Sequence, residues 1–341
     1  MGKQILVTGG TGYIGSHTAV ELINEGFEVI IIDNLSNSKI EVLERIEKIT
    51  GKRPLFEQFD LCLYDKVDLF FKKYPKVEAI IHFAASKAVG ESVNIPLKYY
   101  RNNINSLINL LEGMTSNNIN NFVFSSSCTV YGQPDILPVT EQAPIKKALS
   151  PYGNTKQISE EIIQDAQIPN KNLNAISLRY FNPIGAHPSA LIGELPLGVP
   201  NNLVPFITQT AIGKLKELKV FGNDYNTPDG SCIRDYINVV DLAKAHVVAI
   251  NRLIKGQNKS SFEVFNLGTG RGLSVLEIIN TFQKVTGINV KYEIVNRRAG
   301  DIEKVWADTS FANRELGWKT EKTIEETLLS AWNWEKFIQK K

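Results

Sequence analysis

The chain has 341 residues, of which 43% are hydrophobic and 22% charged, a composition typical of a soluble globular protein. Its formal net charge of +2 is near balance, which excludes a broad basic surface for nucleic acid or for a membrane. No apolar run approaches the roughly 18 residues of a membrane span, and MGKQ leads directly into an apolar strand without room for a signal peptide. We therefore expect a cytoplasmic protein.

The cysteines and histidines indicate neither disulfides nor a metal site. Cys62, Cys128 and Cys232 lie far apart and form no CxxC pair, which fits a reducing compartment. The four histidines show no spacing typical of metal ligands, so we expect no metal.

Short apolar runs alternate with helical stretches over the first half of the chain. Strand-like runs lie at 4–8, 28–33, 54–59, 79–84, 121–127 and 174–179, with helical periodicity at 17–26 and 101–114. Continuous apolar strands that alternate with helices predict an α/β fold with a Rossmann-type, doubly wound parallel sheet.

A glycine-rich turn follows the first strand-like run. Gly9, Gly12 and Gly15 lie in ILVTGGTGYIGSH, and the second run ends in Asp33, 18 residues after Gly15. Such glycines let backbone amides approach a pyrophosphate, and the following helix N-terminus stabilises its charge. Asp33 can accept hydrogen bonds from both ribose hydroxyls and would repel a 2′-phosphate, which favours NAD over NADP. The alternative is a glycine-rich turn in an ordinary α/β fold.

The segment SPYGNTK at 150–156 opens a predicted helix, with Ser150 as its N-cap and Pro151 at its first position. Tyr152 and Lys156 then lie one turn apart on a single face. A nearby ammonium, the helix N-terminus and a positive nicotinamide ring would all lower the pKa of a tyrosine from its usual value of about 10. This spacing therefore predicts that Tyr152 is a base for an alcohol proton, although such a pair is often a packed aromatic beside a solvated lysine.

A serine cluster, VFSSSCTVYG at 123–132, follows the end of a strand, where open α/β sheets bind their ligands. Ser127 could bond the same alcohol oxygen as Tyr152 and relay its proton.

After residue 182 the strand–helix rhythm stops, and proline and glycine punctuate 181–202. A further strand-like run at 261–268 returns the chain to the first part. We expect an NAD-binding domain over 1–180 with a returning segment near 236–270. The remaining ranges, 181–235 and 271–341, would form a smaller α/β substrate domain.

The motifs TGGTGYIG, SSSCTVYG and SPYGNTK together resemble the extended short-chain dehydrogenase/reductase family. Segments such as DNLSNS, HFAASKAVGESV, RYFNPIGAHPS, GVPNNLVP and RDYINVVDLA resemble the UDP-glucose 4-epimerase family more closely, and the match runs from about residue 3 to about residue 335. The resemblance implies reversible C4 epimerisation of UDP-glucose and UDP-galactose in galactose metabolism. It also implies bound NAD, a transient 4-keto sugar that turns while its nucleotide stays anchored, and a homodimer in which 101–114 is a candidate pairing helix.

The resemblance further implies roles for individual residues. Tyr152 is the base, Lys156 holds the nicotinamide ribose and lowers the tyrosine pKa, and Ser127 bridges base and substrate. NAD contacts are implied for Gly9, Gly12, Tyr13, Ile14, Gly15, Asp33, Asn34, Leu35, Ser36, Asn37, Ser38, Asp60, Leu61, Phe83, Ala84, Ala85, Ser86, Lys87, Asn102, Ser127, Tyr152, Lys156 and Phe181. Contacts to the UDP-sugar are implied for Lys87, Ser127, Tyr152, Asn182, Asn202, Leu203, Lys219, Val220, Phe221, Arg234, Arg298, Asp301 and Val305.

Two positions depart from the family pattern. Cys128 stands where alanine commonly follows the three serines, and Val305 stands where enzymes restricted to glucose and galactose carry a tyrosine. The smaller Val305 predicts a pocket that also accepts UDP-GlcNAc and UDP-GalNAc, unless a loop shift refills the space.

Three alternative functions stay open at this point. A UDP-glucuronate 4-epimerase needs only modest pocket changes. A nucleotide-sugar 4,6-dehydratase carries an Asp-Glu pair where this chain has Cys128 and Thr129. An NAD-sensing binding protein typically loses the tyrosine or the lysine, and both are present here.

Overall fold

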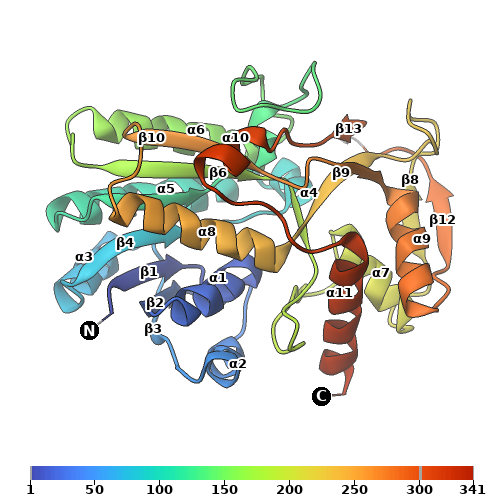
Figure 1. Ribbon diagram of the computed structural model, residues 1–341, viewed down its shortest axis with the longest axis horizontal. Coiled ribbons are helices and arrows are strands. Elements are labelled where there is room, and N and C mark those ends of the chain that lie inside the picture. The colour runs from blue at the N-terminus through green and yellow to red at the C-terminus, as the bar shows by residue number, and fades with distance from the viewer. Residues whose placement is uncertain (1, 299–301, 341) are drawn as a thin grey trace.

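The computed structural model describes residues 2–298 and 302–340, which form a larger and a smaller lobe (Figure 1). The larger lobe is built on a seven-stranded sheet of order β10-β6-β5-β4-β1-β2-β3. Every neighbouring pair in it is parallel. The strands are β1 (Gln4–Thr8), β2 (Glu28–Asp33), β3 (Leu55–Gln58), β4 (Val77–His82), β5 (Asn121–Ser125), β6 (Asn174–Tyr180) and β10 (Phe262–Leu267). The chain winds outward from β1 in both directions, which confirms the predicted Rossmann-type fold.

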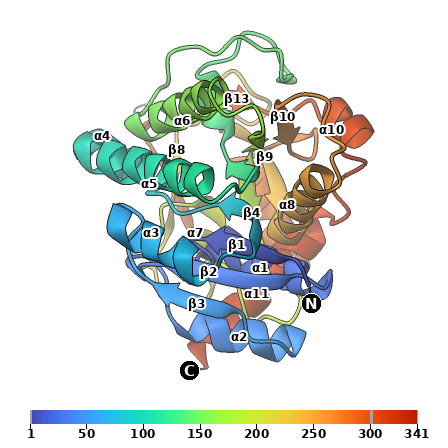
Figure 2. The same ribbon diagram turned by 90° about the vertical axis from the view of Figure 1, so that its left-hand side faces the viewer.

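Helices cover both faces of this sheet (Figure 2). One face carries α1 (Tyr13–Asn24), α2 (Glu41–Thr50) and α8 (Val239–Ile254), and the other carries α3 (Tyr64–Lys73), α5 (Pro96–Ser116) and α6 (Pro151–Gln167). Along β1, Ile5 and Val7 pack on the first group while Leu6 packs on the second. Because both faces are buried, these strands read as continuous apolar runs. In the described part of the chain, no helix is apolar enough over a sufficient length to cross a membrane.

The smaller lobe has its own strands and apolar core. Its strand β9 (Ile233–Asn238) pairs with β7 (Asn182–Ile184), β11 (Gly272–Ser274) and β13 (Lys304–Val305), while β8 (Leu218–Phe221) pairs with β12 (Tyr292–Val295). The helices α7 (Leu203–Ala211), α9 (Val275–Thr286) and α11 (Ile324–Gln339) supply the rest of this core, which includes Ile207, Phe282 and Trp332.

The chain crosses between the lobes more than once. It leaves the large sheet after β6 and returns through α8 and β10, as expected from the strand-like run at 261–268. The short helix α10 (Ser310–Glu315) packs against β10, although it falls in the range expected for the second domain. The limits of the two domains stay a prediction. Two more short helices, α4 (Val89–Asn94) and the 3₁₀ helix η1 (Cys128–Tyr131), lie beside α6.

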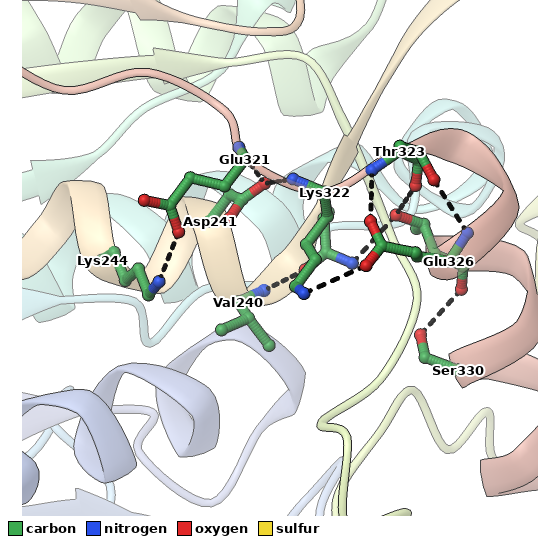
Figure 3. A network of polar contacts seen from close by, with 10 residues as sticks. Val240, Asp241, Lys244, Glu321, Lys322, Thr323, Glu326 and Ser330 are labelled. Carbon is green, nitrogen blue, oxygen red and sulfur yellow. Dashed lines mark hydrogen bonds and ion pairs between the residues drawn. The ribbon is translucent and has the colours of Figure 1, made fainter.

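A network of polar contacts joins α8 to the segment that leads into α11 (Figure 3). The buried Asp241 carboxylate accepts hydrogen bonds from the backbone N–H groups of Glu321 and Lys322, both at 2.9 Å. Thr323 and Glu326 then cap α11 reciprocally. Since α8 covers the large sheet and α11 belongs to the smaller lobe, these bonds fix the two lobes to each other.

Three histidines are buried in the described structure in a neutral form. His17 and His246 donate from Nδ1 to the carbonyl oxygens of Tyr13 and Leu242, and the Nε2 atom of each has no hydrogen-bond partner among the described residues. Burial lowers the pKa of His17 and of His82 to about 3, and that of His246 to about 4. A second proton on any of these rings would place a positive charge in the core.

We expect the free energy of unfolding to fall as the pH is lowered from about 6.5 to about 5. Unfolded histidine binds a proton in this range while the three buried rings do not, so the unfolded state takes up more protons and is favoured. Each histidine contributes about 1.4 kcal/mol per pH unit to this loss. Urea denaturation across this range measures it, and the His246→Gln variant should show a shallower dependence. A free energy of unfolding that stays constant down to pH 5 would contradict the prediction.

Candidate active site

The start of α6 and the end of β5 bring Tyr152, Lys156 and Ser127 together. The Ser150 hydroxyl accepts a hydrogen bond from the Gly153 N–H at 3.1 Å and caps α6, as predicted from SPYGNTK. Tyr152 follows Pro151 in the first turn and is 7% exposed. Ser127 caps η1 immediately after β5, and its hydroxyl interacts with that of Tyr152.

Lys156 is buried under the same strand end. Its ammonium donates a 2.6 Å hydrogen bond to the carbonyl oxygen of Ser125, the last residue of β5. The Nζ atom lies 4.6 Å from the centroid of the Phe124 ring and 6.0 Å from that of Tyr152. The ammonium is therefore held between the sheet edge and the phenol.

The electrostatics differ from the expectation drawn from the sequence. Burial raises the pKa of Tyr152 well above its usual value, and the Ser127 hydroxyl only partly opposes this. Burial also lowers the pKa of Lys156 to about 7, and the Glu160 carboxylate opposes that change. The groups of the chain alone do not lower the pKa of Tyr152, because the loss of water around the phenolate outweighs them.

The glycine turn leaves the start of α1 open to an anion. Gly12 caps α1 without a side chain, and the first turn of this helix holds no acidic residue. A Cβ atom on Gly15 would lie 2.3 Å from the Gly9 carbonyl oxygen, and one on Gly9 would lie 2.8 Å from the Ala84 N. The turn is thus tight enough to exclude side chains, and the free N–H groups that follow fit a pyrophosphate.

Asp33 is fixed beside this turn at the end of β2. Its carboxylate accepts hydrogen bonds from the Leu35 N–H at 2.9 Å, the Ser38 hydroxyl at 3.1 Å and the Thr11 N–H at 3.3 Å. The next strand end, β3, is followed by Asp60, whose carboxylate accepts from the Asn34 amide at 3.4 Å. These acceptors line the place where an adenine nucleotide would follow the pyrophosphate.

Asn103 is a positioning residue that the sequence analysis missed. It is buried on α5, accepts from the Ser86 N–H at 2.8 Å and donates to the Ser86 carbonyl oxygen and the Thr155 hydroxyl, each at 3.0 Å. These bonds attach the predicted cofactor segment 83–87 to α5 and to α6. Its neighbour Asn102, which was predicted, donates to the Ser86 hydroxyl at 3.3 Å. Asparagine is a poor helix former, so the pair NN inside an apolar helical run was a usable signal.

Side chains from both lobes also meet at Glu194, another residue that the sequence analysis missed. Its Oε1 atom accepts from the Lys87 ammonium at 3.2 Å and from the Asn202 amide at 2.6 Å. Nearby, the Tyr13 hydroxyl donates to the Gly185 carbonyl oxygen at 2.6 Å. Lys87, predicted to contact both ligands, is therefore linked through Glu194 to the predicted substrate contact Asn202, and the predicted cofactor contact Tyr13 is bonded to Gly185.

On the smaller lobe, the predicted nucleotide contacts on β8 separate into two groups. Phe221 is 38% exposed, and the guanidinium carbon of Arg298 lies 5.4 Å from its ring centroid. Lys219 is exposed on the same side of the strand. Val220 points the other way into the core, so only its backbone could reach a ligand. Asp301 lies outside the described residues.

Three of the remaining predicted substrate contacts, Asn182, Arg234 and Val305, lie on the paired strands β7, β9 and β13. Arg234 on β9 is in register with Val305 on β13, and its charge lowers the pKa of the Cys128 thiol, which burial raises to about 12. Val305 and Phe181 are buried in one apolar cluster with Val130. Asn182 begins β7 and Leu203 begins α7.

Comparisons with known proteins show which family the chain belongs to. A family model described as GDP-mannose 4,6 dehydratase matches residues 6–330. The UDP-glucose 4-epimerase of Bacillus subtilis (strain 168) is 50% identical over 331 residues, which cover 97% of this chain and 96% of that protein.

Two solved structures are also similar. One is a UDP-glucose-4-epimerase from Stenotrophomonas maltophila with bound NAD and formylated UDP-arabinopyranose, with a TM-score of 0.95, 46% identity and 99% of both chains covered. The other is a UDP-glucose 4-epimerase from Bifidobacterium longum in complex with NAD+ and UDP, with a TM-score of 0.94, 46% identity and 98% of both chains covered.

Proposed function

We propose the reaction of this chain and the roles of its residues from the family to which it belongs. The chain belongs to the UDP-glucose 4-epimerases, which are members of the short-chain dehydrogenase/reductase family. The GDP-mannose 4,6 dehydratase model that it matches describes the same larger family. The enzyme interconverts UDP-glucose and UDP-galactose by inversion at C4, with NAD as its cofactor. The observation that carries this function is the meeting of Tyr152, Lys156 and Ser127 at the end of β5.

The residues of the larger lobe fit NAD. The bare glycine turn and the uncapped start of α1 suit the pyrophosphate, and Asp33 suits the adenosine ribose. Lys156 would hold the nicotinamide ribose. When bound, NAD⁺ supplies hydride acceptance from C4 of the sugar and hydride return to the opposite face.

Tyr152 would take the proton from the O4 hydroxyl, with Ser127 bridging the two oxygens. Because burial raises the pKa of Tyr152, the phenolate depends on positive charge placed against it. The Lys156 ammonium, held at 2.6 Å from the Ser125 carbonyl oxygen, supplies that charge from the chain itself. The same tyrosine returns the proton after the keto sugar has turned.

The smaller lobe would anchor the nucleotide at a distance from the chemistry. Phe221 and Arg298 form an aromatic and a cationic surface suited to uracil and diphosphate, and Arg234 on β9 adds a second guanidinium near η1. Binding at these remote groups keeps the intermediate in place while the sugar presents its other face.

The alternative functions are not borne out by the comparisons. A dehydratase would need further acid–base groups beside Ser127, where this chain has Cys128 and Thr129. The substrate range predicted from Val305 is likewise not borne out and stays a prediction. We place the enzyme in the cytoplasm, which fits its three free cysteines.

We propose that the enzyme is a homodimer that pairs through α4 and α5. Leu97 is 76% exposed, Val93 59% and Ile108 36%, and Leu97 and Ile108 lie on one stripe of α5. These helices lie at the outer side of the larger lobe (Figure 2). Apolar side chains that gather on one exposed face are typical of an interface between chains.

Purified enzyme without added NAD should convert UDP-galactose to UDP-glucose, because no net oxidation occurs and the cofactor is retained. NMR of the anomeric protons follows the conversion. The Tyr152→Phe variant keeps the ring but loses the base, and its kcat should fall by at least about a hundredfold. Equal rates for both proteins would contradict the role of Tyr152.

In the same assay, UDP-GalNAc tests the prediction from Val305. We expect conversion by the unmodified enzyme, and a selective loss of this activity in the Val305→Tyr variant while UDP-galactose is still converted. No turnover of N-acetylated sugars at high enzyme concentration would refute the wider pocket.

The homodimer is tested by sedimentation. The Leu97→Glu variant should shift from dimer to monomer, because a charge in the apolar contact stays unpaired. Leu329→Glu is the matched control, since Leu329 is 41% exposed on α11 of the smaller lobe, a helix that packs on α7 and α9. A monomeric unmodified enzyme, or equal behaviour of the two variants, would contradict the proposed surface.

A further inference from the structure

The proposed reaction leaves a buried carboxylate next to the site without a role. Glu160 is one turn after Lys156 on α6 and is 4% exposed. Its Oε1 atom accepts from the Ser126 hydroxyl at 2.6 Å, the Ser177 hydroxyl at 2.6 Å and the Arg179 Nε at 3.0 Å, and its Oε2 atom accepts from Arg179 at 2.5 Å. The three residues that donate these four hydrogen bonds come from β6 or from the serine turn that follows β5.

One of these bonds leads directly to the reacting groups. Ser126 stands between Ser125, whose carbonyl oxygen holds the Lys156 ammonium at 2.6 Å, and Ser127, which meets Tyr152. The backbone N–H of Ser126 is bound to the Leu178 carbonyl oxygen at 3.0 Å. The hydroxyl of Ser126, held by Glu160, is the second point that fixes this turn. A shift at Ser126 therefore moves both of its neighbours.

The charges around the site also indicate that Glu160 has a role beside Lys156. The titratable groups that face Lys156 and Tyr152 are His82 on β4, Tyr99 on α5, Cys128 on η1, Tyr180 on β6 and Glu160 on α6. Burial lowers the pKa of His82 to about 3 and raises those of Cys128 and Tyr180 to about 12, so these groups are neutral at working pH. Tyr99 is neutral for the same reason, because burial raises its pKa. Of these five groups, Glu160 is the one that carries a charge, and it is paired with Arg179.

We propose that Glu160 is a positioning residue of the reaction: through Ser126 it fixes the turn that carries the Ser125 carbonyl oxygen and the Ser127 hydroxyl, and its charge supports the Lys156 ammonium. The inference rests on the proposed epimerase reaction. Arg179 allows Glu160 to play this role, since a carboxylate this deeply buried needs a paired cation.

The contrasting explanation is a purely structural ion pair, and the chain contains one for comparison. Arg252 on α8 and Glu263 on β10 form a similar buried pair, with bonds of 2.7 and 2.8 Å and both residues 9% exposed. Glu263 contacts Lys259 and Arg252 but not the serine turn. Loss of either pair should lower stability, and only the loss of Glu160 should alter the chemistry.

Two serines give the sharpest test. Ser126→Ala and Ser177→Ala each remove one 2.6 Å hydrogen bond to the same Glu160 oxygen, and both serines are fully buried. We expect Ser126→Ala to lower kcat for UDP-galactose by at least about tenfold with little change in KM, because the reacting groups shift while nucleotide binding does not. Ser177→Ala should keep a kcat within about twofold of the unmodified enzyme. The NAD content of each variant, measured after denaturation, should stay unchanged.

The pH dependence of kcat tests the charge of Glu160, because Glu160→Gln removes the charge and keeps the shape of the side chain. The Lys156 ammonium is lost as the pH rises through the pKa of this lysine, and Glu160 is the group that raises that pKa. Glu160→Gln should therefore move the alkaline fall in kcat to lower pH, whereas Glu263→Gln should leave it in place. If Glu160→Gln does not fold, the comparison of the two serine variants decides.

Equal kcat values for Ser126→Ala and Ser177→Ala would overturn the inference, and so would an alkaline fall in Glu160→Gln that coincides with that of the unmodified enzyme. These outcomes differ from a failure of the proposed function, in which the unmodified enzyme itself does not convert UDP-galactose.

Discussion

The parallel alignment of the large sheet brings the carboxyl ends of β1, β2, β4 and β5 to one edge. The glycine turn, Asp33, the segment 83–87 and the serine turn each begin where one of these strands stops. Backbone groups at such ends have no ladder partner beyond the last strand residue, so they bind helix starts, side chains or ligands. The Ser125 carbonyl oxygen shows this most directly, because its partner is the Lys156 ammonium at 2.6 Å.

Burial at that edge of the sheet makes the charged forms of the site residues costly. Tyr152 and Lys156 have both lost water, which favours the neutral form of each. A reaction that needs a phenolate and an ammonium side by side must therefore recover that stabilisation from fixed charges and dipoles. Among the described residues, the start of α6 lies at Tyr152, and the Ser125 carbonyl oxygen and the Glu160 carboxylate lie beside Lys156.

Much of the fold and part of the site could be predicted from local patterns in the sequence. The glycine turn and the capped start of α6 could be predicted from residues close together in the sequence, and Asp33 from its spacing of 18 residues after Gly15. Asn103, Glu160 and Glu194 were missed, because each has a partner 17 to 107 residues away that only the fold brings near. Among these three, the NN pair at 102–103 gave a local signal. Burial raises the pKa of Tyr152, and this too is a property of the packed structure that the local sequence does not show. The fall expected from Lys156, the start of α6 and the nicotinamide together stays a prediction. The family resemblance implied a substrate contact for Val220, but strand alternation turns the side chain of this residue into the core.

The proposed reaction removes a hydrogen from C4 and returns it to the same carbon within one enzyme. The most direct measurement supplies UDP-galactose labelled with deuterium at C4, in ordinary water, and follows the label in the UDP-glucose formed. We predict that the product keeps the deuterium at C4, because the hydride is held by bound cofactor and does not exchange with solvent. Loss of the label to water would contradict the account, because it would mean that C4 is deprotonated and reprotonated.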